Sequence, residues 1–123
     1  MPSPTIVIAQ NDSTVAMELA SHLHAHFARV AVAESTAELR TMLLRHEARV
    51  AVLDLELVEM EEVRQLARVF EELTIVCTHR SPDEQMWMAA LNAGAVEFCH
   101  PEDIRSILRA SRTAPKLHLA VAA

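Results

Sequence analysis

The sequence predicts a single α/β domain in which strands and helices alternate five times. Short apolar runs rich in β-branched residues recur along the chain, and each is followed by apolar residues at helical spacing. The apolar runs lack a clear polar alternation, which is typical of parallel strands covered by helices on both faces. We therefore expect a doubly wound (βα)5 domain with a parallel five-stranded sheet in the order 2-1-3-4-5. This domain is expected to span residues 1–113, and residues 114–123 are expected to form a tail.

The expected strands are short, and the third carries the most informative residue. The five runs are residues 5–9, 29–33, 50–54, 73–78 and 95–99. The third run is too short for a convincing helix and ends in Asp54. Open α/β sheets bind their ligands at the carboxyl ends of the strands, so Asp54 is the candidate site of this chain.

Capping residues and apolar stripes together indicate the helices. Polar residues at 10–13 close the first strand and can cap the first helix, whereas Ser35 and Glu38 fit a capping box for the second. The sequence Ser-Pro-Asp-Glu at 81–84 predicts a fourth helix with proline in its first turn, which stops before Gly94. The apolar stripes of the first, third and fifth helices are Val15, Leu19 and Leu23; Val63, Leu66 and Phe70; and Ile104, Ile107 and Leu108.

Composition limits the class of protein. A chain of 123 residues, 51% hydrophobic and 23% charged, is long enough to fold around a real core and does not resemble a disordered segment. A net charge of −6 without a basic face argues against direct nucleic-acid binding. The sequence shows neither a membrane-spanning run nor a signal peptide, so we expect a cytoplasmic protein. The single glycine, Gly94, leaves no phosphate-binding glycine loop, which argues against a nucleotide-binding enzyme.

The expected strand order gathers polar residues at one edge of the sheet. The carboxyl ends of the first, third and fourth strands meet around Asp54. Gln10 and Asn11 follow the first strand and Thr78 ends the fourth, so we expect these side chains to share one crevice with Asp54.

With these residues in place, the chain resembles the receiver domain of bacterial response regulators, which has a flavodoxin-like fold. The resemblance rests on Asp54, Thr78, the Asn-Ala-Gly-Ala-Val-Glu-Phe stretch at 92–98 and Pro101. It implies a non-enzymatic module of a two-component phosphorelay in which a histidine kinase or another signalling protein is the partner. In that case Asp54 is the phosphoacceptor, and Thr78 and Phe98 are the switch residues. Output then occurs through protein contacts, including a homodimer formed by the face of the fourth helix, fifth strand and fifth helix.

The chain departs from the family pattern where the family binds Mg²⁺. The acidic pair that holds the ion falls on Gln10 and Asn11, which leaves Asp54 and Glu56 as possible metal ligands. The family's lysine position falls on His100, and a neutral imidazole supplies less positive charge than an ammonium group. Because Mg²⁺ prefers carboxylate ligands, we expect metal-assisted phosphorylation to be slow or absent. The alternative function is a pseudo-receiver that acts as a constitutive interaction module without Mg²⁺-dependent phosphorylation.

Each candidate residue also has a plainer interpretation. Asp54 could cap the loop that follows it, Thr78 could bond to backbone, and Phe98 could be an ordinary core residue. A third function, a small metal-binding α/β protein, would use His79, His100 and Asp54 as ligands, whereas the plainer interpretation is that both histidines are exposed loop residues.

Two further pairs complete the candidates. Cys77 and Cys99 lie on neighbouring expected strands and are interpreted as buried, reduced thiols. Trp87 and Met88 lie on the fourth helix, where an exposed tryptophan would be a plausible anchor for a partner.

Overall fold

The structure is a computed structural model that describes residues 4–112, and it confirms the predicted alternation of strands and helices. The strands are β1 (Thr5–Ala9), β2 (Arg29–Ala33), β3 (Val50–Asp54), β4 (Thr74–Thr78) and β5 (Glu97–Cys99). The helices are α1 (Ser13–Leu23), α2 (Thr36–Arg45), α3 (Met60–Val69), α4 (Glu84–Ala93) and α5 (Ile104–Ser111). The expected domain limit at residue 113 and the tail 114–123 lie outside the described residues.

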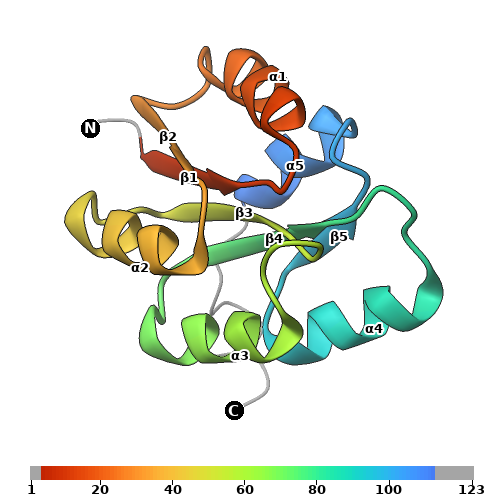
Figure 1. The fold of residues 1–123 in the computed structure, drawn as a ribbon. Helices are drawn as coiled ribbons and strands as arrows, with labels where there is room; N and C mark the ends of the chain where they lie inside the picture. Colours follow the sequence, from red (N-terminus) through yellow and green to blue (C-terminus); the bar gives the residue numbers. More distant parts are fainter. Residues whose placement is uncertain (1–3, 113–123) are drawn as a thin grey trace.

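The five strands form one parallel sheet in the order β2-β1-β3-β4-β5, as predicted (Figure 1). Asp54 is paired with Thr78 in the register of β3 and β4, and Ala9 is paired with Leu53. The residue that follows β1, Gln10, therefore lies next to Asp54. The topology alone brings the carboxyl ends of β1, β3 and β4 to one place.

Helices cover both faces of the sheet. Helices α1 and α5 lie on one face, and α2, α3 and α4 lie on the other (Figure 1). Every residue of the central strands β3 and β4 is buried, because each side chain of these strands faces one helical layer or the other. The core accordingly has two parts, one on each side of the sheet.

The two cysteines lie in different parts of this core. Cys77 packs in the cluster that contains Leu53 and Phe98, whereas Cys99 packs in the cluster that contains Val76 and Ile107. Successive side chains of a strand point to opposite faces, so these neighbouring strands send the two thiols to opposite sides of the sheet. Both are free cysteines, as the sequence indicated. Burial raises the pKa of each thiol to about 12.

Side-chain caps begin most of the helices. Asp12 caps α1, Ser35 caps α2, Asp83 caps α4 and Asp103 caps α5. The expected capping box is only half formed: Ser35 accepts from the amide of Glu38, but the Glu38 carboxylate accepts from the amide of Glu34.

The start of α4 and the start of β5 differ from the prediction. Asp83 is the cap of α4, so Pro82 precedes the helix instead of standing in its first turn. Strand β5 begins at Glu97 and not at residue 95, because the amide of Ala95 donates to the carbonyl of Ala90 and closes the end of α4. Gly94 makes this closure possible with a φ of 120°.

None of the helices among residues 4–112 is both long enough and apolar enough to span a membrane.

Candidate functional site

Asp54 is fixed from two sides at the carboxyl end of the sheet. The residue is only 5% exposed. Its Oδ2 accepts a hydrogen bond of 2.9 Å from the amide of Asn11, and its Oδ1 accepts one of 2.9 Å from the amide of Glu56. The second bond is the loop-capping contact of the plainer interpretation, whereas the first joins β3 to the loop after β1. The carboxylate therefore holds two loops at once.

Gln10 and Thr78 meet beside this carboxylate. The side-chain Nε2 of Gln10 donates a hydrogen bond of 3.0 Å to Oγ1 of Thr78, and both residues are buried, at 6% and 0% exposed. The crevice expected from the sequence thus contains Gln10, Asn11, Asp54 and Thr78, although Asn11 contributes its backbone amide to Asp54.

Glu56 and Arg80 form the outer wall of the site. The guanidinium of Arg80 donates to Glu56 through both Nε and Nη2, each at 2.8 Å, which is the bidentate arrangement that favours arginine over lysine. The hydrogen bond from Arg80 holds the pKa of the Glu56 carboxyl below its usual value. Glu56 lines the crevice, but its carboxylate is already paired with Arg80.

These contacts form a closed ring around the strand ends. Asp54 is joined to Glu56 through the loop amide, Glu56 to Arg80 through the ion pair, and Gln10 to Thr78 through the buried hydrogen bond. The chain itself completes the ring. Asn11, whose amide is bonded to Asp54, follows Gln10, and Arg80 lies two residues after Thr78. A pocket of about 290 Å³ opens at this ring, and it is lined by Gln10, Asn11, Asp12, Val15, Asp54, Glu56 and Arg80.

Sequence reasoning did not single out Arg80. The available signal was its position. Asp54 and Thr78 are paired at the ends of β3 and β4, so the residues two places after each, Glu56 and Arg80, lie at the same edge of the sheet. The opposite charges at these two positions favour an ion pair across the strand ends.

Asp12 lines the pocket but serves its own helix. Its Oδ1 accepts from the amides of Thr14 and Val15 at 2.8 and 3.4 Å, which makes it the cap of α1. The carboxylate is thus engaged with backbone amides at the start of its own helix.

The proposed metal site of His79, His100 and Asp54 is not formed. Nδ1 of His79 accepts from the amide of Ser81 at 2.9 Å, and Nδ1 of His100 accepts from the amide of Glu102 at 3.0 Å. Each imidazole is therefore tied to its own loop, and neither histidine lines the pocket at Asp54. Within residues 4–112, no three His, Cys, Asp or Glu side chains come together as a metal site requires. This part of the prediction was wrong because strand adjacency does not fix the direction of a loop side chain.

Phe98 is buried in the core on the face covered by α2, α3 and α4. It packs in the same cluster as Cys77 and Ala90, on the face of the sheet that α4 covers. His100, at the position of the family's lysine, is partly buried and is turned to its own loop.

The carboxylates of this pocket do not fit a divalent cation in this arrangement. Mg²⁺ requires several hard oxygen ligands in near-octahedral geometry. Asp12 and Asp54 already accept hydrogen bonds from backbone amides, and Glu56 is held in an ion pair with Arg80. The amide Nε2 of Gln10 is a donor and is occupied by Thr78.

Comparison with known proteins finds relatives in structure only. No protein-family model and no curated protein sequence matches the chain. Solved structures do match. A response regulator from Thermotoga maritima superposes with a TM-score of 0.80 at 16% identity, over 90% of this chain and 99% of the other. A CheY-like response regulator receiver domain protein from Methanospirillum hungatei gives a TM-score of 0.75 at 17% identity, over 87% and 89%.

A third match carries a ligand and a modification. It is a response regulator protein from Burkholderia pseudomallei with a phosphorylated aspartic acid, a calcium ion and citrate. It gives a TM-score of 0.79 at 18% identity and covers 98% of this chain and 73% of the other. The topology, the strand order and these superpositions agree, and the chain has the fold of response regulator receiver domains.

Proposed function

We propose that this chain is a receiver-type module of two-component signalling that acts by binding other proteins and not as an enzyme. Its crevice is held in one state without Mg²⁺-dependent phosphorylation, which is the pseudo-receiver version of the function. The observation that carries this proposal is the buried hydrogen bond from Gln10 to Thr78.

In the family that the chain resembles, the hydroxyl at the position of Thr78 bonds to the phosphoryl group on the aspartate. Here the amide of Gln10 already donates to that hydroxyl oxygen at 3.0 Å. Turning Thr78 toward a phosphoryl group would leave a buried amide donor without a partner, which costs about 1–3 kcal/mol. The side chain that replaces an acidic residue therefore also stabilises the switch hydroxyl in a fixed position.

The charges at the site support the same version. Phosphoryl transfer depends on cations that neutralise the transferring group. The lysine position carries His100, whose Nδ1 is bonded to its own loop, and the carboxylates are engaged as described above. Of the residues that line the pocket, Arg80 alone is cationic, and it is paired with Glu56.

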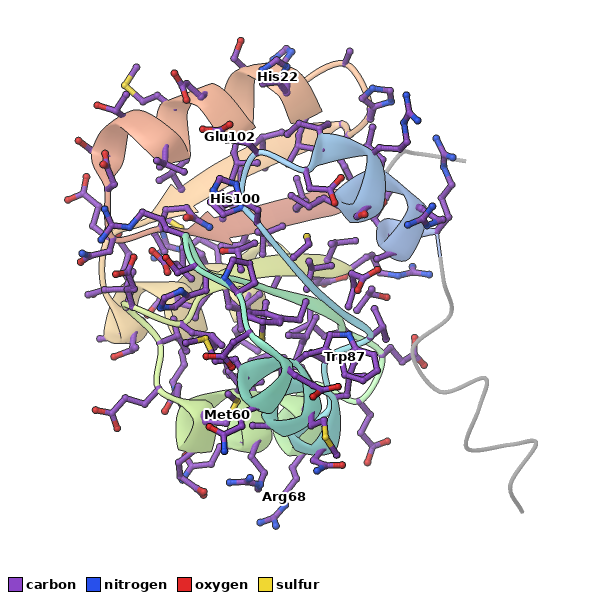
Figure 2. All side chains as sticks on the ribbon, turned by 90° about the vertical axis from the view of Figure 1, so that its right-hand side faces the viewer. His22, Met60, Arg68, Trp87, His100 and Glu102 are labelled. Carbon is purple, nitrogen blue, oxygen red and sulfur yellow. The ribbon has the colours of Figure 1, made fainter. Side chains whose placement is uncertain are left out.

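The face of α4, β5 and α5 is the proposed output surface, and Figure 2 looks onto it. Trp87 and Met88 of α4 are 46% and 54% exposed, which is high for large apolar side chains. Aromatic side chains of this kind dominate the binding energy of many protein interfaces. We propose that a signalling partner, or a second copy of the chain, covers these two residues.

The test of this function is a titration of the labelled protein with beryllofluoride and Mg²⁺, followed by amide NMR spectra. We expect the amides of residues 10, 11, 54 and 78 to stay unmoved, because the ring already occupies the groups that a phosphoryl mimic would need. Saturable shifts at these amides would contradict the pseudo-receiver.

One observation favours the second candidate, in which Asp54 is a working phosphoacceptor. The pocket of about 290 Å³ includes Asp54 in its lining, so a small donor has space near the carboxylate. Beryllofluoride shifts that disappear in the Asp54→Asn variant would establish this candidate instead.

A further inference from the structure

The pocket at Asp54 holds three carboxylates and one cation. Asp12, Asp54 and Glu56 contribute the negative charges, and Arg80 is the single positively charged residue in the lining. Carboxylates in one pocket repel one another unless a positive charge offsets them. In many such sites a metal ion supplies that charge, whereas here the donor set does not fit one.

The guanidinium of Arg80 is placed to supply it. Its two donors grip Glu56 at 2.8 Å each. The pKa of Arg80 is raised first by this hydrogen bond and then by the charge of Glu56, with additional contributions from Asp12 and Asp54. Arg80 thus contacts one of the three carboxylates directly, and the other two line the same pocket.

Arg80 also joins two loops. Glu56 lies in the loop between β3 and α3 and donates its own amide to Asp54 at 2.9 Å, and Arg80 lies in the loop between β4 and α4. A metal ion at this edge of the sheet would make the same connection through its ligands.

We propose that Arg80 is the resident cation of this pocket and takes over both tasks of a divalent ion, offsetting the carboxylates and tying the two loops together. The inference rests on the proposed function, because it explains how a pseudo-receiver crevice is held together without Mg²⁺. It implies that the wild-type fold is indifferent to divalent cations, and that removing Arg80 destabilises the pocket without creating a metal site, because no three carboxylates among residues 4–112 are grouped to hold an ion.

The rival explanation is that Arg80 and Glu56 form an ordinary surface ion pair, which would contribute little. The side chain of Arg80 is 61% exposed, so this rival is a serious one. The chain provides a matched control in Arg64 and Glu61, an exposed pair on α3 with a 2.6 Å contact. Arg64 does not line the pocket, so its removal leaves the three carboxylates unchanged.

The experiment is thermal unfolding of the full chain in Mg²⁺, in Ca²⁺ and in chelator, at equal ionic strength. We expect the Tm of the wild type not to differ between the three solutions, and we expect the same independence for Arg64→Ala. We expect Arg80→Ala to lower the Tm by more than Arg64→Ala does, and by the same amount in Mg²⁺, in Ca²⁺ and in chelator.

Two outcomes would overturn the inference. A metal-induced rise in the Tm of the wild type would show that the pocket takes an ion despite Arg80. A loss of Tm in Arg80→Ala that is no larger than the loss in Arg64→Ala would reduce Arg80 and Glu56 to an ordinary surface pair. If Arg80→Ala does not fold, Arg80→Gln, which keeps hydrogen-bond donors but no charge, is measured in the same way. These unfolding curves report neither phosphorylation nor partner binding, so the proposed function is judged separately by the beryllofluoride spectra.

Discussion

The side-chain amide of Gln10 donates a buried hydrogen bond to the hydroxyl of Thr78, 68 positions further along the chain. Gln10 follows β1 and Thr78 ends β4, and these two strands are not adjacent because β3 lies between them. The bond therefore crosses the end of β3, where Asp54 is held by the amides of Asn11 and Glu56. The three strand ends are fixed to one another by groups that belong to the chain itself.

Removing the Gln10 side chain should destabilise the fold. Gln10→Ala leaves the buried Thr78 hydroxyl with one partner fewer, and we expect a loss of about 1–3 kcal/mol in the free energy of unfolding. Urea denaturation measures this loss. The control is the cycle with Thr78→Val, because the double variant should lose less than the sum of the two single variants. Strict additivity would mean that the two side chains do not interact in solution.

Gly94→Ala should destabilise the packing of α3 on α4. Gly94 has a φ of 120°, and a Cβ built there would lie 2.6 Å from the Cβ of Ala67. Both the backbone conformation and the contact resist a side chain, so we expect a loss of about 1–3 kcal/mol in the free energy of unfolding. The companion variant Gly94→Ala with Ala67→Gly relieves the contact but not the φ, and it should recover part of the loss. A Gly94→Ala variant as stable as the wild type would show that α3 and α4 are further apart than described.

Both thiols should be inert in the native protein. Thiolates are the reactive species, and burial raises the pKa of Cys77 and Cys99 to about 12. We expect a thiol reagent at neutral pH to label neither cysteine before unfolding and both after it. Cys77→Ser and Cys99→Ser assign any reaction to one residue. Rapid labelling of native protein, or a disulfide between the two, would contradict their placement on opposite faces of the sheet.

The Glu56–Arg80 pair should make stability sensitive to acid and insensitive to pH near neutrality. The hydrogen bond from Arg80 lowers the pKa of Glu56 from its usual 4.5. A group with a lowered pKa in the folded state contributes stability above its unfolded pKa and loses it as pH falls through the folded pKa. We expect Glu56→Gln to lose less Tm than the wild type between neutral pH and about pH 3. Parallel curves for the two proteins would mean that the pair contributes nothing to stability. Asp103, whose pKa is lowered by hydrogen bonds from Ser106, provides the comparison through Asp103→Asn.

The fold could be predicted because its signals are local and repeated. A run such as β3 is apolar throughout because both of its faces are buried, and caps such as Ser35 and Asp83 mark helix starts by their side-chain chemistry. Strand order then followed from the general behaviour of doubly wound sheets. The errors lay at element ends, where the start of β5 depends on the hydrogen bond between Ala95 and Ala90 and not on apolar character.

The site could be predicted only as far as the backbone determines it. Asp54, Gln10 and Thr78 meet because their strands bring them together, and side chains that are buried at strand ends have little freedom. Arg80 was missed because a long side chain in a loop can reach several partners, and the sequence does not say which. The histidine site failed for the same reason, since His79 and His100 each bond to the second amide beyond them.

The most direct test of the central claim is the intact mass of the protein after incubation with acetyl phosphate and Mg²⁺. The ring around Asp54 predicts a mass that stays unchanged for the wild type, in the presence or absence of the metal. An increase by one phosphoryl group that requires Mg²⁺ and is abolished in Asp54→Asn would contradict a crevice that is fixed without metal or phosphorylation.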